Sequence, residues 1–188
     1  MKRDRLKFLI LTALFAAIIG LLAQVSIPIP PVPFTGQTLA VGLAATILGA
    51  RYGTLSVLLY ILLGIVGIPV FSSMTSGLGI VLGPTGGYIV GFIPAAFLTG
   101  LYIEKTKLNF TNAMIANTIG MIVALVFGTV WLKLSSDLTW ITAILSGAAP
   151  FIVLGLVKAA LASYLGVIIR NRLMTARLLP HYSTEMQK

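Results

Sequence analysis

The sequence predicts an all-α membrane protein that crosses the bilayer six times. Of its 188 residues, 58% are hydrophobic and only 9% are charged, whereas soluble domains carry about 25% charged residues. Apolar runs recur along the whole chain, and the polar segments between them are short. No stretch is polar enough to form a soluble domain beside the helices. We therefore expect one membrane-embedded substrate-binding domain over residues 1–188.

The six expected spans are apolar runs, most of them close to the roughly 20 residues that a helix needs to cross a bilayer. They cover residues 6–25, 37–50, 54–70, 87–103, 112–132 and 146–170. Four prolines between residues 26 and 33 exclude a helix there, because proline lacks an amide donor and clashes with the preceding turn. Residues 51–53 predict a tight turn, and residues 137–145 an interfacial piece.

The basic residues predict the orientation of these spans. With a cytoplasmic N-terminus, 11 of the 13 Lys and Arg residues fall on the inner side, and only Lys133 and Lys158 fall elsewhere. Both termini are then cytoplasmic, and residues 26–36, 71–86 and 133–145 form long structured outer loops. The stretch 71–87 holds five glycines and a proline, so we expect it to be non-helical. We interpret it as a loop that folds over the outer mouth of the bundle.

The polar inventory excludes several classes of function. Cysteine is absent, the single histidine lies in the polar tail, and no nucleotide-binding or hydrolase motif occurs, so we expect no catalytic residue, metal or cofactor. The positive charges lie in loops and tails, which argues for membrane topology rather than nucleic-acid binding. The four acidic residues lie outside the middles of the spans: Asp4, Glu104, Asp137 and Glu185. What remains is a membrane-embedded small-molecule binder that needs a partner for energy.

Lys158 is the main candidate for a ligand contact. It is the only charged residue between Asp137 and Arg170, and a charge in the middle of a span costs about 2.5 kcal/mol or more. Arg170 lies about 18 Å further along a helix, which is too far for the lysine to reach the inner interface. No span supplies a counter-ion. The lysine therefore contacts a ligand, lines a solvated cavity or contacts a partner subunit.

Other side chains within the spans are weaker candidates. Gln37 and Asn117 are polar, and Asn117 needs a hydrogen-bond partner on a neighbouring helix or on a ligand. Tyr88 and Trp131 lie at span ends, where aromatic residues usually mark the interface. In the first span, Ala13 and Ala17 form a small-residue face that allows close helix packing, within the bundle or against a partner.

Several segments together resemble the BioY family, the biotin-specific substrate-binding (S) components of energy-coupling-factor vitamin transporters. The resemblance covers residues 6–172, and its most specific part is the glycine-rich block at residues 77–92. The other matching segments are residues 33–41, 48–56, 60–71, 150–151 and Lys158.

The resemblance implies a multi-pass protein of the cell membrane that binds biotin from outside without changing it. It further implies docking through Ala13 and Ala17 onto a transmembrane coupling subunit with two cytoplasmic ATPases, so that ATP is used only by the partners. Lys158 would bond the carboxylate or the ureido carbonyl of biotin. The full set of expected substrate contacts is Lys158, Tyr88, Gln37, Asn117, Phe34, Thr35, Trp131, Gly86 and Gly87.

One position departs from the family pattern. The last helix of the family typically carries an aspartate three residues before the lysine, and this chain has Gly155 there. In the family pattern, this aspartate could accept hydrogen bonds from the ureido N–H groups of biotin. The candidates to take its role here are Asn117, Gln37 or backbone carbonyls of residues 77–87. Three alternatives to biotin uptake stay open: an S component for another vitamin, a secondary transporter that works without ATPases, and a structural membrane subunit without a ligand.

Overall fold

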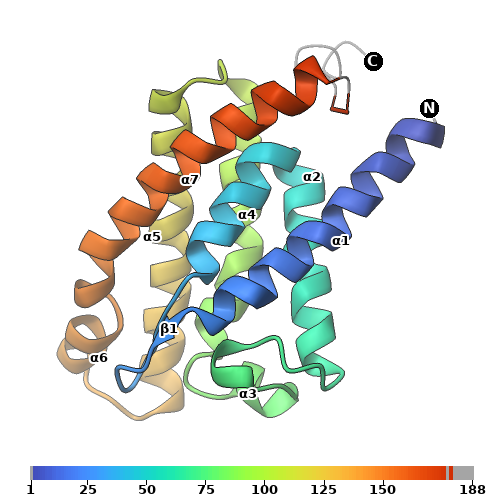
Figure 1. Cartoon of the computed structure of the whole chain (residues 1–188). Helices are drawn as coiled ribbons and strands as arrows, with labels where there is room; N and C mark the ends of the chain where they lie inside the picture. Colours follow the sequence, from blue (N-terminus) through green and yellow to red (C-terminus); the bar gives the residue numbers. More distant parts are fainter. Residues whose placement is uncertain (1, 177, 180–188) are drawn as a thin grey trace.

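The computed structural model describes residues 2–176 and 178–179, except for the side chains of residues 2–4 (Figure 1). Its long helices are apolar, as expected for a membrane bundle. Within the described residues, five helical stretches are long and apolar enough to cross a membrane: Arg5–Gln24, Gln37–Ile65, Gly86–Lys105, Phe110–Ser135 and Trp140–Thr175.

The elements follow the predicted order with different bounds. They are α1 (Lys2–Gln24), β1 (Ser26–Ile27), β2 (Phe34–Thr35), α2 (Gln37–Ile65), the 3₁₀ turn η1 (Ser72–Met74), α3 (Leu78–Leu82), α4 (Gly86–Lys105), α5 (Phe110–Ser135), α6 (Trp140–Gly147) and α7 (Ala149–Thr175). The proline-rich stretch is non-helical, as predicted, but its ends pair as a small antiparallel β1–β2 hairpin. The fold is therefore not purely α.

The turn expected at residues 51–53 lies instead at Gly49, inside α2. Gly49 has φ 83° and ψ −174°, a conformation that is essentially restricted to glycine. A Cβ built on Gly53 would lie 2.8 Å from the Cα of Ala45, whereas eight residues of a straight helix span about 12 Å. The chain therefore reverses at Gly49, so that α2 is a pair of packed segments. The second segment ends at Ile65, short of the predicted residue 70.

Two further expectations about the loops need correction. The stretch 71–87, predicted to be non-helical, contains η1 and the short helix α3 before α4 begins at Gly86. Helix α3 forms because residues 78–82 present apolar side chains, of which Val81 is buried. The interfacial piece predicted at residues 137–145 is the helix α6, and Thr139 caps its first turn by accepting from the amide of Thr142.

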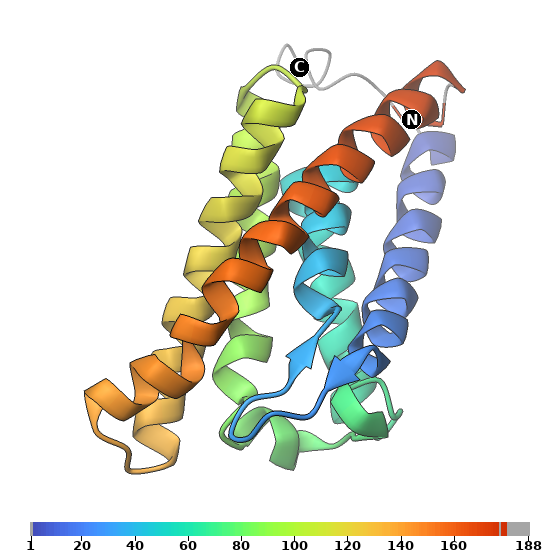
Figure 2. The same cartoon turned by 60° about the vertical axis from the view of Figure 1, so that its left-hand side comes forward.

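Helix α4 packs against both α2 and α5, and α7 crosses the face formed by α2 and α5 (Figure 2). Small residues let α7 approach the first segment of α2. A Cβ on Gly42 would lie 3.1 Å from the Cβ of Ala162, and one on Gly166 would lie 2.7 Å from Cγ2 of Thr46. The two helices thus run side by side in the same direction, and this contact places α7 beside the site.

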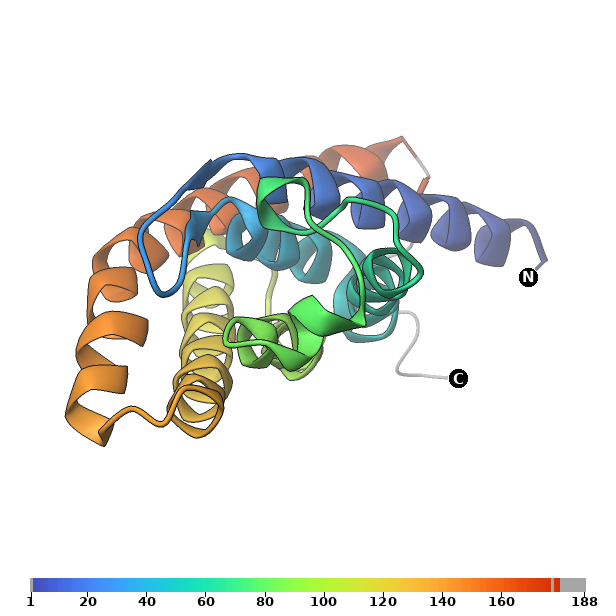
Figure 3. The same cartoon turned by 90° about the horizontal axis from the view of Figure 1, so that it is seen from below.

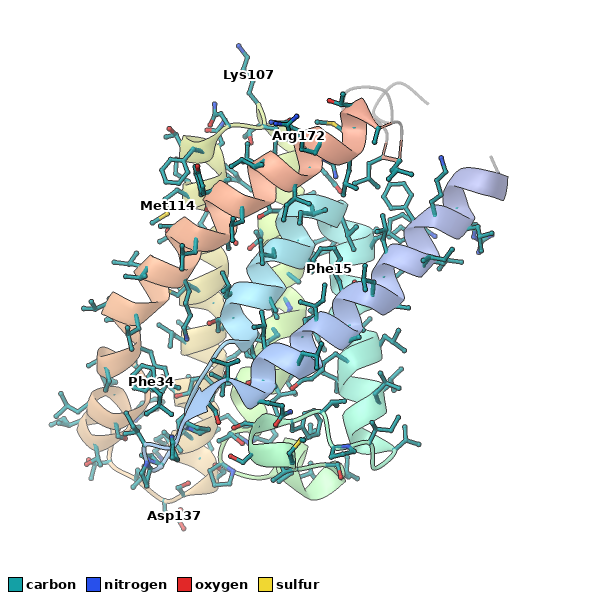
Figure 4. All side chains as sticks on the ribbon, in the orientation of Figure 1. Phe15, Phe34, Lys107, Met114, Asp137 and Arg172 are labelled. Carbon is teal, nitrogen blue, oxygen red and sulfur yellow. The ribbon has the colours of Figure 1, made fainter. Side chains whose placement is uncertain are left out.

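The two ends of the bundle differ. Lys107 and Arg172 lie at one end, together with the start of α1 and the end of α7, and we call this the basic end (Figure 4). Phe34 and Asp137 lie at the opposite end (Figure 4). There the β1–β2 hairpin, η1 and α3 spread across the helices, while α6 lies at the edge of the bundle (Figure 3). We call this the cavity end.

Candidate functional site

A cavity of about 230 Å³ opens at the cavity end. This volume is slightly below the roughly 300–1,000 Å³ of typical small-molecule sites, so the cavity suits one compact ligand. Residues from the hairpin, α2, the segment between α2 and α4, and helices α4, α5 and α7 line it. Its apolar wall includes Val32, Ile80, Ile89, Phe92, Leu125 and Phe151.

Lys158 is the one charged residue among those that line the cavity in the described chain. Its ammonium group donates to the backbone oxygen of Thr35 at 2.6 Å, and it lies 6.0 Å from the ring centre of Phe34. The acceptor that Lys158 meets in this structure is therefore a backbone carbonyl of the hairpin. Which group takes the role of the missing carboxylate toward a ligand stays a prediction, with Asn117, Gln37 and the backbone carbonyls of residues 77–87 as the candidates.

Three residues of α7 share the face that borders the cavity. Phe151, Gly155 and Lys158 are spaced by four and three residues, so the helical repeat aligns them. The ring of Phe151 stacks on that of Phe34, with centres 4.2 Å apart. A Cβ on Gly155 would lie 2.4 Å from Sδ of Met121, so the methionine fills the space that a side chain at position 155 would take.

Gln37 forms the polar wall where α2 begins. Its Nε2 donates to the hydroxyl of Tyr60, and its Oε1 accepts from Oγ1 of Thr35 at 2.7 Å. The side chain is 6% exposed, so these contacts fix its orientation. Both Gln37 and Thr35 line the cavity, in agreement with their place among the predicted site residues.

Tyr88 also lines the cavity, although its position at a span end would suit an interfacial aromatic. Its hydroxyl donates to the backbone oxygen of Gly147 at 2.7 Å, and its ring centre lies 6.2 Å from that of Phe151. The bond ties α4 to the end of α6. Its aromatic ring is therefore held as a fixed part of the wall.

Five predicted contact residues are not among those that line this cavity: Phe34, Trp131, Gly86, Gly87 and Asn117. The first four support the residues that do. Phe34 stacks on Phe151, and Nε1 of Trp131 donates to the backbone oxygen of Gly83 at 3.0 Å, which holds the segment after α3. A Cβ on Gly86 would lie 1.8 Å from the oxygen of Val81, and one on Gly87 would lie 2.1 Å from Cβ of Trp131. Both glycines thus allow close backbone packing.

Asn117 lies deeper, in a smaller cavity of about 30 Å³ that Lys158 also lines. Its Nδ2 donates to Oγ1 of Thr46 at 3.0 Å, to Oγ of Ser163 at 3.1 Å and to the oxygen of Ala113 at 2.9 Å. The amide therefore joins α5 to α2 and α7. We expected Asn117 to bond either a neighbouring helix or a ligand. Neighbouring helices supply the bonds to Thr46 and Ser163, and a ligand contact stays a prediction.

Sequence reasoning missed several cavity residues. Phe151 could have been found, because it lies seven residues before Lys158 on the same helix face. Ser72 and Ser73 could not, because their position depends on the fold of the loop after α2. Thr38 and Thr85 are similar additions, and all five residues line the cavity.

Ala13 and Ala17 lie together on the exposed side of α1, and the buried residues Ala16 and Gly20 face the bundle. The first pair is therefore available to a partner, and the second serves internal packing. Within the described residues, no group of three or more His, Cys, Asp or Glu side chains is placed to hold a metal ion. The cavity suits binding of a small molecule that offers an acceptor to an ammonium group.

Comparisons with known proteins agree with this arrangement. The chain is 42% identical to "Biotin transporter BioY2" of Lactococcus lactis over 169 residues, which are 90% of this chain and 93% of the relative. It is 41% identical to a probable biotin transporter BioY of Pyrococcus horikoshii (87% and 93% covered) and 38% identical to the biotin transporter BioY of Thermotoga maritima (87% and 95% covered).

The fold also matches a solved structure. The crystal structure of the S-component for biotin from an ECF-type ABC transporter superposes with a TM-score of 0.85 at 30% identity, and the match covers 91% of this chain and 94% of that one. Residues 1–175 match the sequence profile of the family described as "BioY family". The chain belongs to the BioY family.

Proposed function

We propose that this chain is the biotin-binding S component of an energy-coupling-factor transporter. It binds biotin in the cavity at the cavity end and releases it chemically unchanged, so it is not an enzyme. The observation that carries the proposal is Lys158, an ammonium in a largely apolar cavity that no carboxylate of the described residues lines. Its partner is a neutral carbonyl, which a ligand oxygen can replace without leaving a buried anion unpaired.

We place the fused ring of biotin at the inner side of the cavity, with its ureido carbonyl on Lys158. Lys158 lines both the main cavity and the deeper one, which puts it at the inner side. Phe151 and Tyr88 line the same cavity and offer aromatic surface to the ring system. The carboxylate then points to the exposed Ser73, where water reduces the cost of its desolvation.

The membrane arrangement in this proposal has six crossings. The reversal at Gly49 makes α2 two crossing segments, and helices α1, α4, α5 and α7 supply the other four. The basic end is cytoplasmic, because membrane proteins concentrate Lys and Arg in cytoplasmic loops. The cavity end then faces outward, and both termini lie inside the cell. We propose the cell membrane as the location, with one substrate-binding domain.

Energy comes from partner proteins in this proposal. The described chain holds no acidic residue that lines the cavity, and such a residue would be expected of a carrier that uses a proton or sodium gradient. The partners are a transmembrane coupling subunit and a cytoplasmic ATPase pair, and only these use ATP. The exposed pair Ala13 and Ala17 of α1 is the docking face, where small side chains allow close approach.

Titration calorimetry of the purified chain with biotin, and with other vitamins in parallel, tests the proposal. We expect saturable one-to-one binding of biotin and much weaker binding of the other vitamins. Preference for another vitamin would make the chain an S component of different specificity. Biotin uptake by the chain alone in liposomes would support a secondary transporter. No binding at all would contradict the proposal.

Comparing biotin with its amide tests the orientation. If Lys158 holds the ureido carbonyl, Lys158→Ala weakens both ligands by the same factor. If it holds the carboxylate, the substitution weakens biotin much more than the amide. The ratio of the two affinities therefore separates the two arrangements, whatever the absolute affinity.

A further inference from the structure

The turn at residues 71–75, here called the lid turn, borders the cavity and is held from α1. Its residues Ser72, Ser73 and Thr75 line the cavity. Phe71 anchors one side of it, fully buried with its ring against Gly64, where an added Cβ would lie 2.1 Å from Cζ. The other side has no such apolar anchor, since Met74 is 69% exposed.

Gln24, the last residue of α1, bonds the lid turn at both sides. Its Oε1 accepts from the amide of Met74 at 2.9 Å, and its Nε2 donates to the backbone oxygen of Phe71 at 2.9 Å. Nε2 also donates to the oxygen of Gly20 within α1 at 3.1 Å, which fixes the side chain on its own helix. One amide group thus fastens the lid turn to α1 at two points, Phe71 and Met74.

The lid turn needs this support because its backbone is strained. Ser73 and Met74 have φ of 58° and 57°, and neither is a glycine. Non-glycine residues are disfavoured in this left-handed region, because their Cβ comes too close to the following carbonyl oxygen. The bonds from Gln24, together with the bond from Oγ1 of Thr75 to the oxygen of Ser72 at 2.8 Å, offset that cost. Without Gln24, Met74 loses its bond to α1, and the turn is held by its buried Phe71 and by the backbone bond from the amide of Phe71 to the oxygen of Thr75 at 3.0 Å.

We infer that Gln24 is a positioning residue for the ligand, and that it slows biotin release by holding the lid turn over the cavity. It does not touch the ligand, since it is absent from the residues that line the cavity in the described chain. The inference rests on the proposed function. It adds that the helix carrying the proposed docking face also holds the turn that covers the ligand.

The test measures biotin dissociation from the purified full chain by chase of labelled biotin. Gln24→Leu removes all three bonds, two of which hold the lid turn, and we expect dissociation about tenfold faster with little change in association. A tenfold change corresponds to about 1.4 kcal/mol, which is within the net contribution expected of the two bonds to the lid turn. Gln24→Glu keeps the acceptor for the amide of Met74, so its dissociation rate should fall between those of the unaltered chain and of Gln24→Leu. This second variant keeps the test possible if Gln24→Leu does not fold. Thr12→Val is the matched control, because Thr12 is a buried polar residue of α1 whose hydroxyl donates to the backbone oxygen of Phe8 within the same helix.

A rescue variant separates positioning from a direct ligand contact. Met74→Gly removes strain at an exposed residue outside the cavity lining, so in the Gln24→Leu background it should restore part of the slow dissociation. Dissociation from Gln24→Leu and Gln24→Glu at the rate of the unaltered chain would overturn the inference, as would absence of rescue by Met74→Gly. Failure of the unaltered chain to bind biotin would overturn the proposed function instead.

Discussion

Helix α7 carries two cations that each donate to a backbone carbonyl, and the surroundings of the two differ. Lys158 bonds Thr35, just before α2 begins, and Arg170 bonds Ile47, just before α2 reverses. The two cations are twelve positions apart in the sequence, and so are the two residues whose carbonyls accept from them. The separations match because α7 and the first segment of α2 run in parallel. Lys158 is half-buried beside a cavity, whereas Arg170 is 1% exposed.

The two cations carry the same charge and differ in burial, and we expect this difference to separate a ligand-binding role for Lys158 from a structural role for Arg170. At the basic end, Arg170 meets the end of one helical segment, and Glu104 accepts from the amide of Ala50 at 2.8 Å at the start of the next. Both charges suit the dipoles of the segments they meet. At the cavity end, Thr35 accepts one of the three ammonium hydrogens of Lys158, and the group borders open volume.

The largest effect on stability is expected at the basic end. Arg170→Met leaves the oxygen of Ile47 buried without its charged donor, so we expect a loss of about 3 kcal/mol in the free energy of unfolding. Thermal unfolding of the purified chain measures it, and biotin affinity of the folded protein should stay close to that of the unaltered chain. Arg172→Met, at an exposed position on the same helix, is the control. Equal unfolding midpoints for the two variants would remove the proposed contrast.

An intermediate effect is expected where the cavity end depends on backbone packing. Gly86→Ala places a Cβ against the oxygen of Val81, and overpacking of this kind costs about 1–3 kcal/mol. We expect α3 to shift and biotin affinity to fall about tenfold, measured by calorimetry. Gly79→Ala is the matched control in α3, since an added Cβ there meets nothing within 4 Å. Equal affinities for the two variants would mean that packing at Gly86 does not shape the site.

A smaller effect is expected from the bond that holds the segment after α3. Trp131→Phe removes the donor to Gly83 and keeps most of the aromatic surface. We therefore expect the free energy of unfolding to fall by about 1 kcal/mol and biotin to be released a few times faster. The chase of labelled biotin measures it. Trp140→Phe, at an exposed residue beside Lys133, is the control. Release that is faster in the control than in Trp131→Phe would contradict this role.

The helical bundle was largely predictable because the bilayer fixes the length and polarity of each span. The turn inside α2 was misplaced for a local reason. The polar Arg51 and Gly53, two residues later, predict a break, but the conformation that reverses the chain occurs at Gly49. Nothing in the sequence separates these two glycines, since the choice depends on how the two segments pack.

A site residue could be predicted only where the cost of burying its polar side chain is evident from its own span. Lys158 could be found because a charge in a span needs an explanation by itself. The same argument applied to Asn117 gave two possible partners, and the neighbouring helices supply its bonds. Ser72 and Ser73 escaped prediction because their turn depends on Gln24, whose partners lie 47 and 50 residues away.

The central claim is that Lys158 binds the ligand while Arg170 holds the fold. Measuring biotin affinity and thermal unfolding for Lys158→Met and Arg170→Met side by side tests it most directly. For Lys158→Met we expect about 100-fold weaker binding, equal to about 2.7 kcal/mol, with an unfolding midpoint close to that of the unaltered chain. For Arg170→Met we expect the reverse pattern. Biotin affinity that is unchanged in Lys158→Met would contradict the account.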